Sequence, residues 1–166
     1  MKEGLIKELE IQQTFILNTI NCLSEEDSGF KPKEKMYTVA QHIGHAAETI
    51  DWFMEGAFGK GFEMNFDNYE ERMKEKYNSF DDSVKLLKEA TSRGIETIKN
   101  ASDAELMAPI TGEIMKGAPK MSVIGGITDH TAHHRGALAV YARLLDRVPM
   151  MPYAGMWKVN YFSKIT

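Results

Sequence analysis

The stretch ITDHTAHHRGALAVYARLL, residues 127–145, carries a helical pattern and three of the chain's five histidines. Its apolar positions recur every three or four residues, the period of an α-helix with one face turned toward a core. With the residues just before it, the apolar arc holds Val123, Ile124, Ile127, His134, Leu138, Tyr141, Ala142 and Leu145. His130 lies near the edge of this arc and His133 well outside it. The pattern predicts a helix over 122–145, although Gly125 and Gly126 weaken its first turn.

Three other long segments, 3–23, 38–58 and 80–100, repeat apolar residues with a similar period. Thr38 with Gln41 three residues later has the form of a capping box, so the second helix is expected to begin there. Four long amphipathic patterns without a convincing series of strands favour an all-α fold. The sequence therefore predicts a four-helix bundle that forms one domain over residues 1–166.

The connection between the second and third long helices is itself long, and a short charged helix is predicted within it at 67–77. A link of this length permits a crossover rather than a simple hairpin. One more helical turn is predicted at 102–107, where Ser102 and Glu105 again have the form of a capping box.

Two segments rich in proline and glycine are expected to be irregular. Residues 109–119 are interpreted as a loop or a hairpin. Beyond Pro149 a long helix is excluded, and Tyr153 and Trp157 are available to pack against the bundle.

Composition narrows the class of protein. Apolar residues make up 43% of the chain and charged residues 27%, as in ordinary globular proteins. The net charge of −4 comes without any dense basic block, so neither nucleic acid nor a membrane is an expected partner. No run approaches about 18 apolar residues and charges interrupt the first turns, so the expected location is the cytoplasm. The single Cys22 is expected to act as a small buried hydrophobe.

All five histidines fall in two predicted helices, within TVAQHIGHAAE (38–48) and TDHTAHHRGAL (128–138). Residues four apart on a helix differ by about 40° and lie one turn apart, so His130 and His134 can direct both imidazoles at one point. Neutral imidazole is an effective ligand for transition metals. The alternative interpretation is that both are core histidines satisfied by hydrogen bonds, but a second helix with histidines favours a metal site.

Residues on the second helix leave the choice of a third ligand open. His42 lies closer to the apolar arc, whereas His45 lies on its flank beside Thr49 and Trp52. Periodicity alone narrowly favours His42. Glu48 lies opposite the arc and is expected to be solvated.

The segments TVAQHIGH, DHTAHHRGALAVYARLL and PMMPYAG together resemble the DinB-like superfamily, which includes bacillithiol transferases and mycothiol-dependent maleylpyruvate isomerases. The resemblance spans nearly the whole helical plan and implies a DinB-like four-helix bundle. It also implies that a histidine seven positions after an initial Thr or Ser binds a metal. In this chain the initial residue is Thr38, and the histidine is His45. The second family motif maps onto His130 and His134, while His42 and His133 become residues that support the ligands. Family members often have glutamine where this chain has Ala137.

Three neutral histidines leave a divalent ion with its full charge and at least one open coordination position, which is the pattern of a catalytic site. The resemblance favours a metal-dependent enzyme that transfers a low-molecular-weight thiol to a small molecule. A metal-dependent hydrolase is the second enzymatic hypothesis, and a non-enzymatic metal-binding or stress-response protein is the third. Zinc or nickel is the expected ion, with iron or manganese as alternatives. The apolar helices and the resemblance also predict a homodimer.

Overall fold

The computed structural model describes residues 1–65 and 67–155, and the regular elements in these ranges are all helical. The fold is a four-helix bundle, as the sequence predicts. Its long helices are α1 (Lys2–Ile20), α2 (Val39–Phe58), α4 (Phe80–Asn100) and α6 (Val123–Leu144). The shorter elements are α3 (Tyr69–Lys76), α5 (Asp103–Met107) and the 3-10 turns η1 (Glu25–Asp27) and η2 (Lys120–Ser122).

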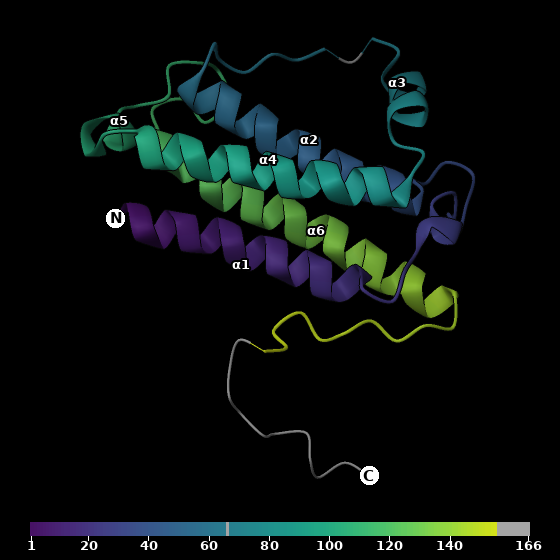
Figure 1. Ribbon diagram of the computed structural model, residues 1–166. Helices are drawn as coiled ribbons and strands as arrows, with labels where there is room; N and C mark the ends of the chain where they lie inside the picture. Colours follow the sequence, from purple (N-terminus) through teal and green to yellow (C-terminus); the bar gives the residue numbers. More distant parts are fainter. Residues whose placement is uncertain (66, 156–166) are drawn as a thin grey trace.

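The four long helices lie side by side, and their order around the bundle is α1, α6, α2, α4 (Figure 1). α1 and α6 run in one direction, and α2 and α4 run in the other. Because α2 and α4 are parallel neighbours, the chain between them has to return along the length of the bundle. The long connection that carries α3 is therefore a crossover, as its length permits.

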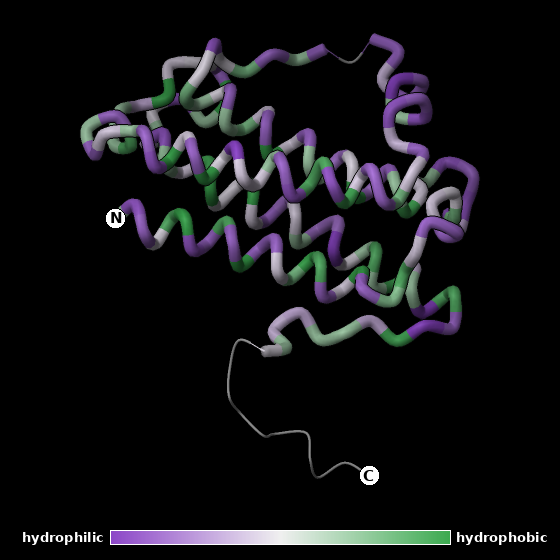
Figure 2. The backbone as a smooth tube through the Cα atoms, in the orientation of Figure 1, coloured by the Kyte–Doolittle hydropathy of each residue, from purple (hydrophilic) through white to green (hydrophobic). Residues whose placement is uncertain are grey.

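The core lies between the four helices. Along each helix, hydrophobic and hydrophilic residues alternate in short stretches, as the colours of the tube in Figure 2 show. Each long helix contributes aliphatic side chains that are almost fully buried, among them Leu9, Ile16, Ile43, Ile50, Leu87, Ile98, Ile124, Ile127 and Leu138. Burial of such side chains is worth about 1.5–3 kcal/mol each and is the main source of stability. The apolar arcs predicted from the sequence are thus the helix faces that pack against one another in the core.

The start of α2 is fixed by the capping box that the sequence predicts. The Gln41 backbone N–H donates to Thr38 Oγ1 at 3.2 Å, and the Thr38 N–H donates to Gln41 Oε1 at 2.9 Å. The Ser102 hydroxyl likewise accepts from the Glu105 N–H at 3.1 Å at the start of α5. These caps satisfy backbone donors that a helix leaves free at its first turn.

The helix boundaries match the predicted ones within a few residues. The largest difference is at the end of α1, which stops at Ile20 rather than near Leu23. The Leu23 N–H turns back to the Ile20 carbonyl at 2.9 Å, and Ser24 then begins the capping box of η1 with Asp27. This polar cap ends the helix although the apolar pattern continues.

Residues 109–119 form a tight hairpin-like turn rather than an open loop. Pro109 and Pro119 form an antiparallel bridge, and the Ile110 N–H donates to the Ala118 carbonyl at 2.8 Å. Met115 adopts a left-handed conformation within the turn.

The described part of the C-terminal tail packs against α1. Tyr153 meets Phe15 edge to face at 5.0 Å between ring centroids, and Asn18 Nδ2 donates to the Pro152 carbonyl at 2.8 Å. The predicted packing of Trp157 lies outside the described residues. Within those residues, no helix is both long and apolar enough to cross a lipid bilayer.

Candidate metal centre

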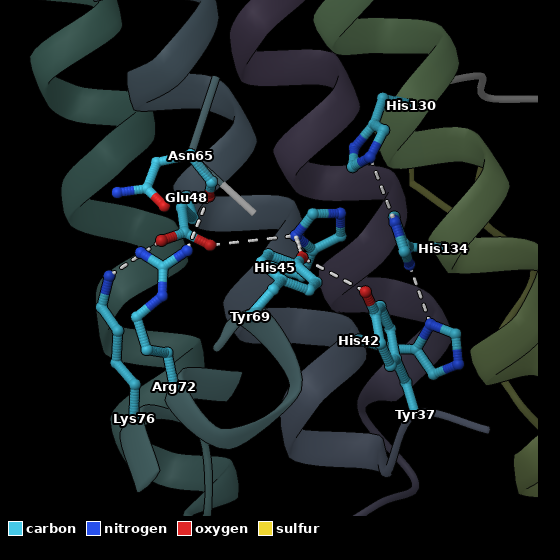
Figure 3. Close-up of polar contacts among 10 residues, drawn as sticks. All are labelled: Tyr37, His42, His45, Glu48, Asn65, Tyr69, Arg72, Lys76, His130 and His134. Carbon is cyan, nitrogen blue, oxygen red and sulfur yellow. Dashed lines mark hydrogen bonds and ion pairs between the residues drawn. The ribbon is translucent and has the colours of Figure 1, made fainter. Parts of the chain in front are cut away.

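Two neighbouring helices, α2 and α6, bring His42 and His45 close to His130 and His134 (Figure 3). One ring nitrogen from each of His45, His130 and His134 lies within 4.8 Å of the other two. These are the three residues that the family resemblance selects. The group could hold a metal ion, because three imidazoles that converge at this spacing can be bridged by one ion with bonds of about 2.0–2.1 Å.

The pair on α6 follows directly from helix geometry. His130 and His134 are one turn apart, and their Nε2 atoms lie 3.3 Å from each other. The His45 ring approaches from α2, with its centroid 5.0 Å from the centroids of both. Two candidate ligand positions are therefore preset by one helix, and the packing of α2 on α6 adds the third.

His42 lies behind this group rather than in it. Its Nδ1 contacts His134 Nδ1 at 2.8 Å, and its Nε2 contacts the Tyr141 hydroxyl at 3.2 Å. Only 7% of His42 is exposed, so the periodicity that places it toward the core is confirmed. His133 is exposed on the outer side of α6, although its ring touches the edge of the His134 ring.

The far side of the His45 ring contacts polar groups from α3 and α2. Its Nδ1 lies 2.9 Å from the Tyr69 hydroxyl and 3.9 Å from Glu48 Oε2. Glu48 also pairs with Lys76 Nζ at 3.1 Å. The expectation that Glu48 is solvated holds only in part: its side chain is 37% exposed, but α3 folds over this face of α2 and brings Lys76 and Tyr69 to it. A carboxylate behind a ligand histidine favours the tautomer that points a lone pair toward a metal.

Tyr37 covers the histidines from the loop before α2. Its ring is stacked on that of His134 at 6.3 Å and meets His42 and His45 edge to face at 5.5 and 5.6 Å. Its hydroxyl donates to the Tyr69 hydroxyl at 3.2 Å. Sequence reasoning missed Tyr37 and Tyr69, and only their positions next to the starts of two helices could have pointed to them.

Burial keeps three of the clustered imidazoles neutral. It lowers the pKa of His134 to about 2. The surrounding histidines lower it further, because two protonated imidazoles side by side would repel each other. Burial likewise lowers the pKa of His42 and that of His130 to about 4. Hydrogen bonding to His45 lowers the pKa of Glu48 to about 2, despite partial burial, with help from Lys76. At neutral pH His42, His130 and His134 therefore remain uncharged, and each keeps a nitrogen lone pair.

The donor set also leaves one polar atom without a protein partner. His130 Nδ1 is buried and makes no hydrogen bond with the described residues. Buried polar atoms are nearly always satisfied, so such an exception in a cluster of ligand-type residues is what an ion-binding site predicts. The residues present therefore fit a divalent transition metal.

The class of protein that follows is a helical bundle with a candidate three-histidine metal centre between two of its helices. A family model described as the DinB superfamily matches residues 8–138, and the chain belongs to that superfamily. No curated protein matches the chain in sequence.

Two solved structures from Bacillus subtilis share the fold. YfiT, described as "a probable metal-dependent hydrolase with an unusual four-helix bundle topology", is 16% identical, with a TM-score of 0.68 over 88% of each chain. The DinB-like protein YjoA is 14% identical, with a TM-score of 0.62 over 89% of this chain and 95% of its own. At these identities the likeness establishes the fold alone.

Proposed function

We propose that the chain is a metal-dependent hydrolase of a small-molecule substrate, with one divalent ion bound by His45, His130 and His134. The observation that carries the proposal is the convergence of three histidine ring nitrogens from two helices within 4.8 Å of one another. The description of YfiT as a probable metal-dependent hydrolase on the same fold supports the reaction class.

The donor set favours zinc or nickel, because imidazole nitrogen is a preferred ligand of both, with iron or manganese as alternatives. When bound by three neutral histidines, such an ion supplies a Lewis acid with an open position that can activate water or a thiol. The chain's own contribution is orientation. Glu48 and Tyr69 hold the His45 ring from behind, His42 holds the His134 ring, and Tyr37 shields the cluster from one side.

Thiol transfer is the second candidate function, favoured by the resemblance of the histidine motifs to those of the thiol-dependent members of the family. The same activated position serves a thiol as well as water. The two reactions differ in whether a low-molecular-weight thiol is consumed. A protein that binds the metal but does neither would belong to the non-enzymatic class.

An assay with defined metals separates the three. Tag-free protein stripped with chelator and reloaded with zinc or nickel is tested on a panel of small esters and amides, and on electrophiles with and without a thiol. Hydrolysis without thiol supports the proposal, consumption of thiol supports the second candidate, and metal binding with neither activity overturns both. His130→Ala should abolish turnover, while His133→Ala on the exposed side of α6 should keep most of it.

We also propose that the protein forms a homodimer. Val140 and Leu144 lie one turn apart on α6 and are each 56% exposed, and Val148 just beyond is 84% exposed. Apolar side chains gathered at one helix end often mark a protein interface. Light scattering is expected to give twice the 18.8 kDa of one chain, and Leu144→Glu should shift it to the monomer. A single 18.8 kDa species at all working concentrations would refute this.

A further inference from the structure

A continuous hydrogen-bonded chain runs from the loop before α2 to the candidate metal centre. The Tyr141 hydroxyl lies 3.0 Å from the Tyr37 carbonyl oxygen and 3.2 Å from His42 Nε2. His42 Nδ1 then lies 2.8 Å from His134 Nδ1, and His134 Nε2 lies 3.3 Å from His130 Nε2. Figure 3 shows the last of these contacts in line from His42 to His130.

The chemistry of the groups fixes which atom donates at each step. A carbonyl oxygen only accepts, so the Tyr141 hydroxyl gives its single proton to Tyr37. The Tyr141 oxygen is then an acceptor, and His42 Nε2 must carry the proton that it receives. A neutral imidazole has one N–H and one lone pair, so His42 Nδ1 is left as an acceptor.

The same logic continues into the site. His134 Nδ1 must carry the proton donated to His42 Nδ1, which leaves His134 Nε2 as a lone pair. That lone pair faces His130 and accepts from its Nε2–H. His130 Nδ1 is then a bare lone pair, which agrees with its being the buried nitrogen that has no hydrogen-bond partner. Every contact along the chain has one donor and one acceptor in this arrangement alone.

We propose that His42 and Tyr141 are positioning residues that hold His134 in its Nδ1–H tautomer and so keep its Nε2 lone pair turned toward the candidate metal centre. The functional value of this arrangement rests on the proposed metal site, but the tautomers themselves belong to the metal-free chain. Tautomer control of a ligand histidine usually comes from a carboxylate or a carbonyl, which accept only. Here the acceptor is a second histidine, which has two tautomers of its own.

That difference assigns a role to Tyr141, two steps from the site. If His42 carried its proton on Nδ1, two N–H groups would face each other across 2.8 Å, and His134 would have to change tautomer or move. The Tyr141 hydroxyl prevents this, because its own proton is committed to the Tyr37 carbonyl. Tyr141 is 1% exposed, so water does not replace it in this role.

Nitrogen-15 NMR of the metal-free protein, labelled at histidine, tests the tautomers directly at pH 7.5. Long-range proton–nitrogen correlations are expected to show Nδ1–H for His134 and Nε2–H for His42 and His130. An Nε2–H tautomer for His134 would overturn the proposal, whatever the protein's metal affinity. Expected tautomers in a protein that fails to bind zinc would keep the positioning chain and overturn the proposed function instead.

Paired substitutions test the role of each residue. Tyr141→Phe keeps the ring and removes the acceptor, so His134 is expected to populate both tautomers and zinc affinity to fall about 10 to 100-fold. His42→Leu should have a comparable effect, whereas His42→Gln, whose amide oxygen can accept from His134 Nδ1–H, should recover part of the loss. Circular dichroism checks that each variant folds. Unchanged His134 tautomer and zinc affinity in both Tyr141→Phe and His42→Leu would contradict the assignment.

Discussion

Gly44 shows how tightly α3 and its flanking residues are fitted beside the site. The Tyr77 ring lies so close to it that a Cβ atom on residue 44 would be 2.2 Å from Tyr77 Cδ1. Tyr77 is only 2% exposed, so its ring has little room to move away. The absence of a side chain next to His45 therefore lets the segment after α3 close over α2.

Gly44→Ala is expected to lower the free energy of unfolding by about 1–3 kcal/mol, because overpacking outweighs the better helix propensity of alanine. Urea denaturation measures the change. Gly136→Ala is the matched control, since nothing lies within 4 Å of its added Cβ and the substitution should be neutral or stabilising by up to about 1 kcal/mol. A Gly44→Ala variant as stable as the wild type would show that Tyr77 can retreat.

The histidines on α2 show what periodicity can and cannot predict at the residue scale. It places His42 inward, which is confirmed, but the most buried histidine on this helix is not in the three-histidine group. The three-histidine group lies at the edge of the core, where a bound ion would keep an open coordination position. The histidine that α2 contributes there is His45, which lies on the flank of its apolar arc. Only the family motif points there, because one helical wheel does not locate the edge of the contact with another helix.

At the scale of elements, the starts of helices were the most predictable features. The Thr38 and Gln41 spacing forms its capping box because both partners lie within four residues of each other. The role of α3 was not predictable, since its segment reads only as short and charged. Its position over His45 depends on Tyr69, Lys76 and Tyr77, whose partners on α2 are more than 20 residues away in the sequence.

Thr38→Ala removes the side-chain acceptor at the first turn of α2 and should cost about 1 kcal/mol of stability. Chemical denaturation provides the measurement, and Thr38→Ser, which retains the hydroxyl, should recover most of the loss. Thr97→Ala is a useful comparison, because its hydroxyl donates within an exposed helical turn rather than capping one. Equal losses for Thr38→Ala and Thr97→Ala would argue against a special role for the cap.

For the whole molecule, the parallel run of α2 and α4 links the fold to the site. The crossover that this topology demands is the segment that carries α3, so the same connection closes the bundle and covers His45. The sequence indicated a long link between the second and third long helices. It did not indicate that these two helices lie next to each other in parallel, because four similar apolar arcs can be arranged around a bundle in several ways.

The buried histidines should make the metal-free protein sensitive to mild acid. His42, His130 and His134 have lowered pKa values when folded, so below about pH 6.5 the unfolded chain takes up protons that the folded chain does not. Stability should therefore fall from about pH 6.5 toward pH 4, by up to about 1.4 kcal/mol per pH unit for each histidine.

Thermal unfolding in the presence of chelator at pH 7.5, 6 and 5 would measure this loss. The decline between pH 6.5 and 5 precedes the titration of ordinary carboxylates, so it reports the histidines. His134→Gln removes one of the three buried imidazoles and should flatten the profile in this window. A wild-type melting temperature that stays constant from pH 7.5 to 5 would be inconsistent with neutral, buried imidazoles.

Zinc titration of the tag-free, chelator-treated protein and its five His→Ala variants tests the central claim most directly. The wild type should bind one ion per chain. His45→Ala, His130→Ala and His134→Ala each remove a direct ligand and should weaken zinc binding by more than about 100-fold. His42→Ala removes a supporting residue and should weaken it by roughly 10 to 100-fold. His133→Ala should bind zinc nearly as well as the wild type. Equal losses at all five positions, or tight binding retained by His45→Ala and lost in His42→Ala, would contradict the three-histidine centre.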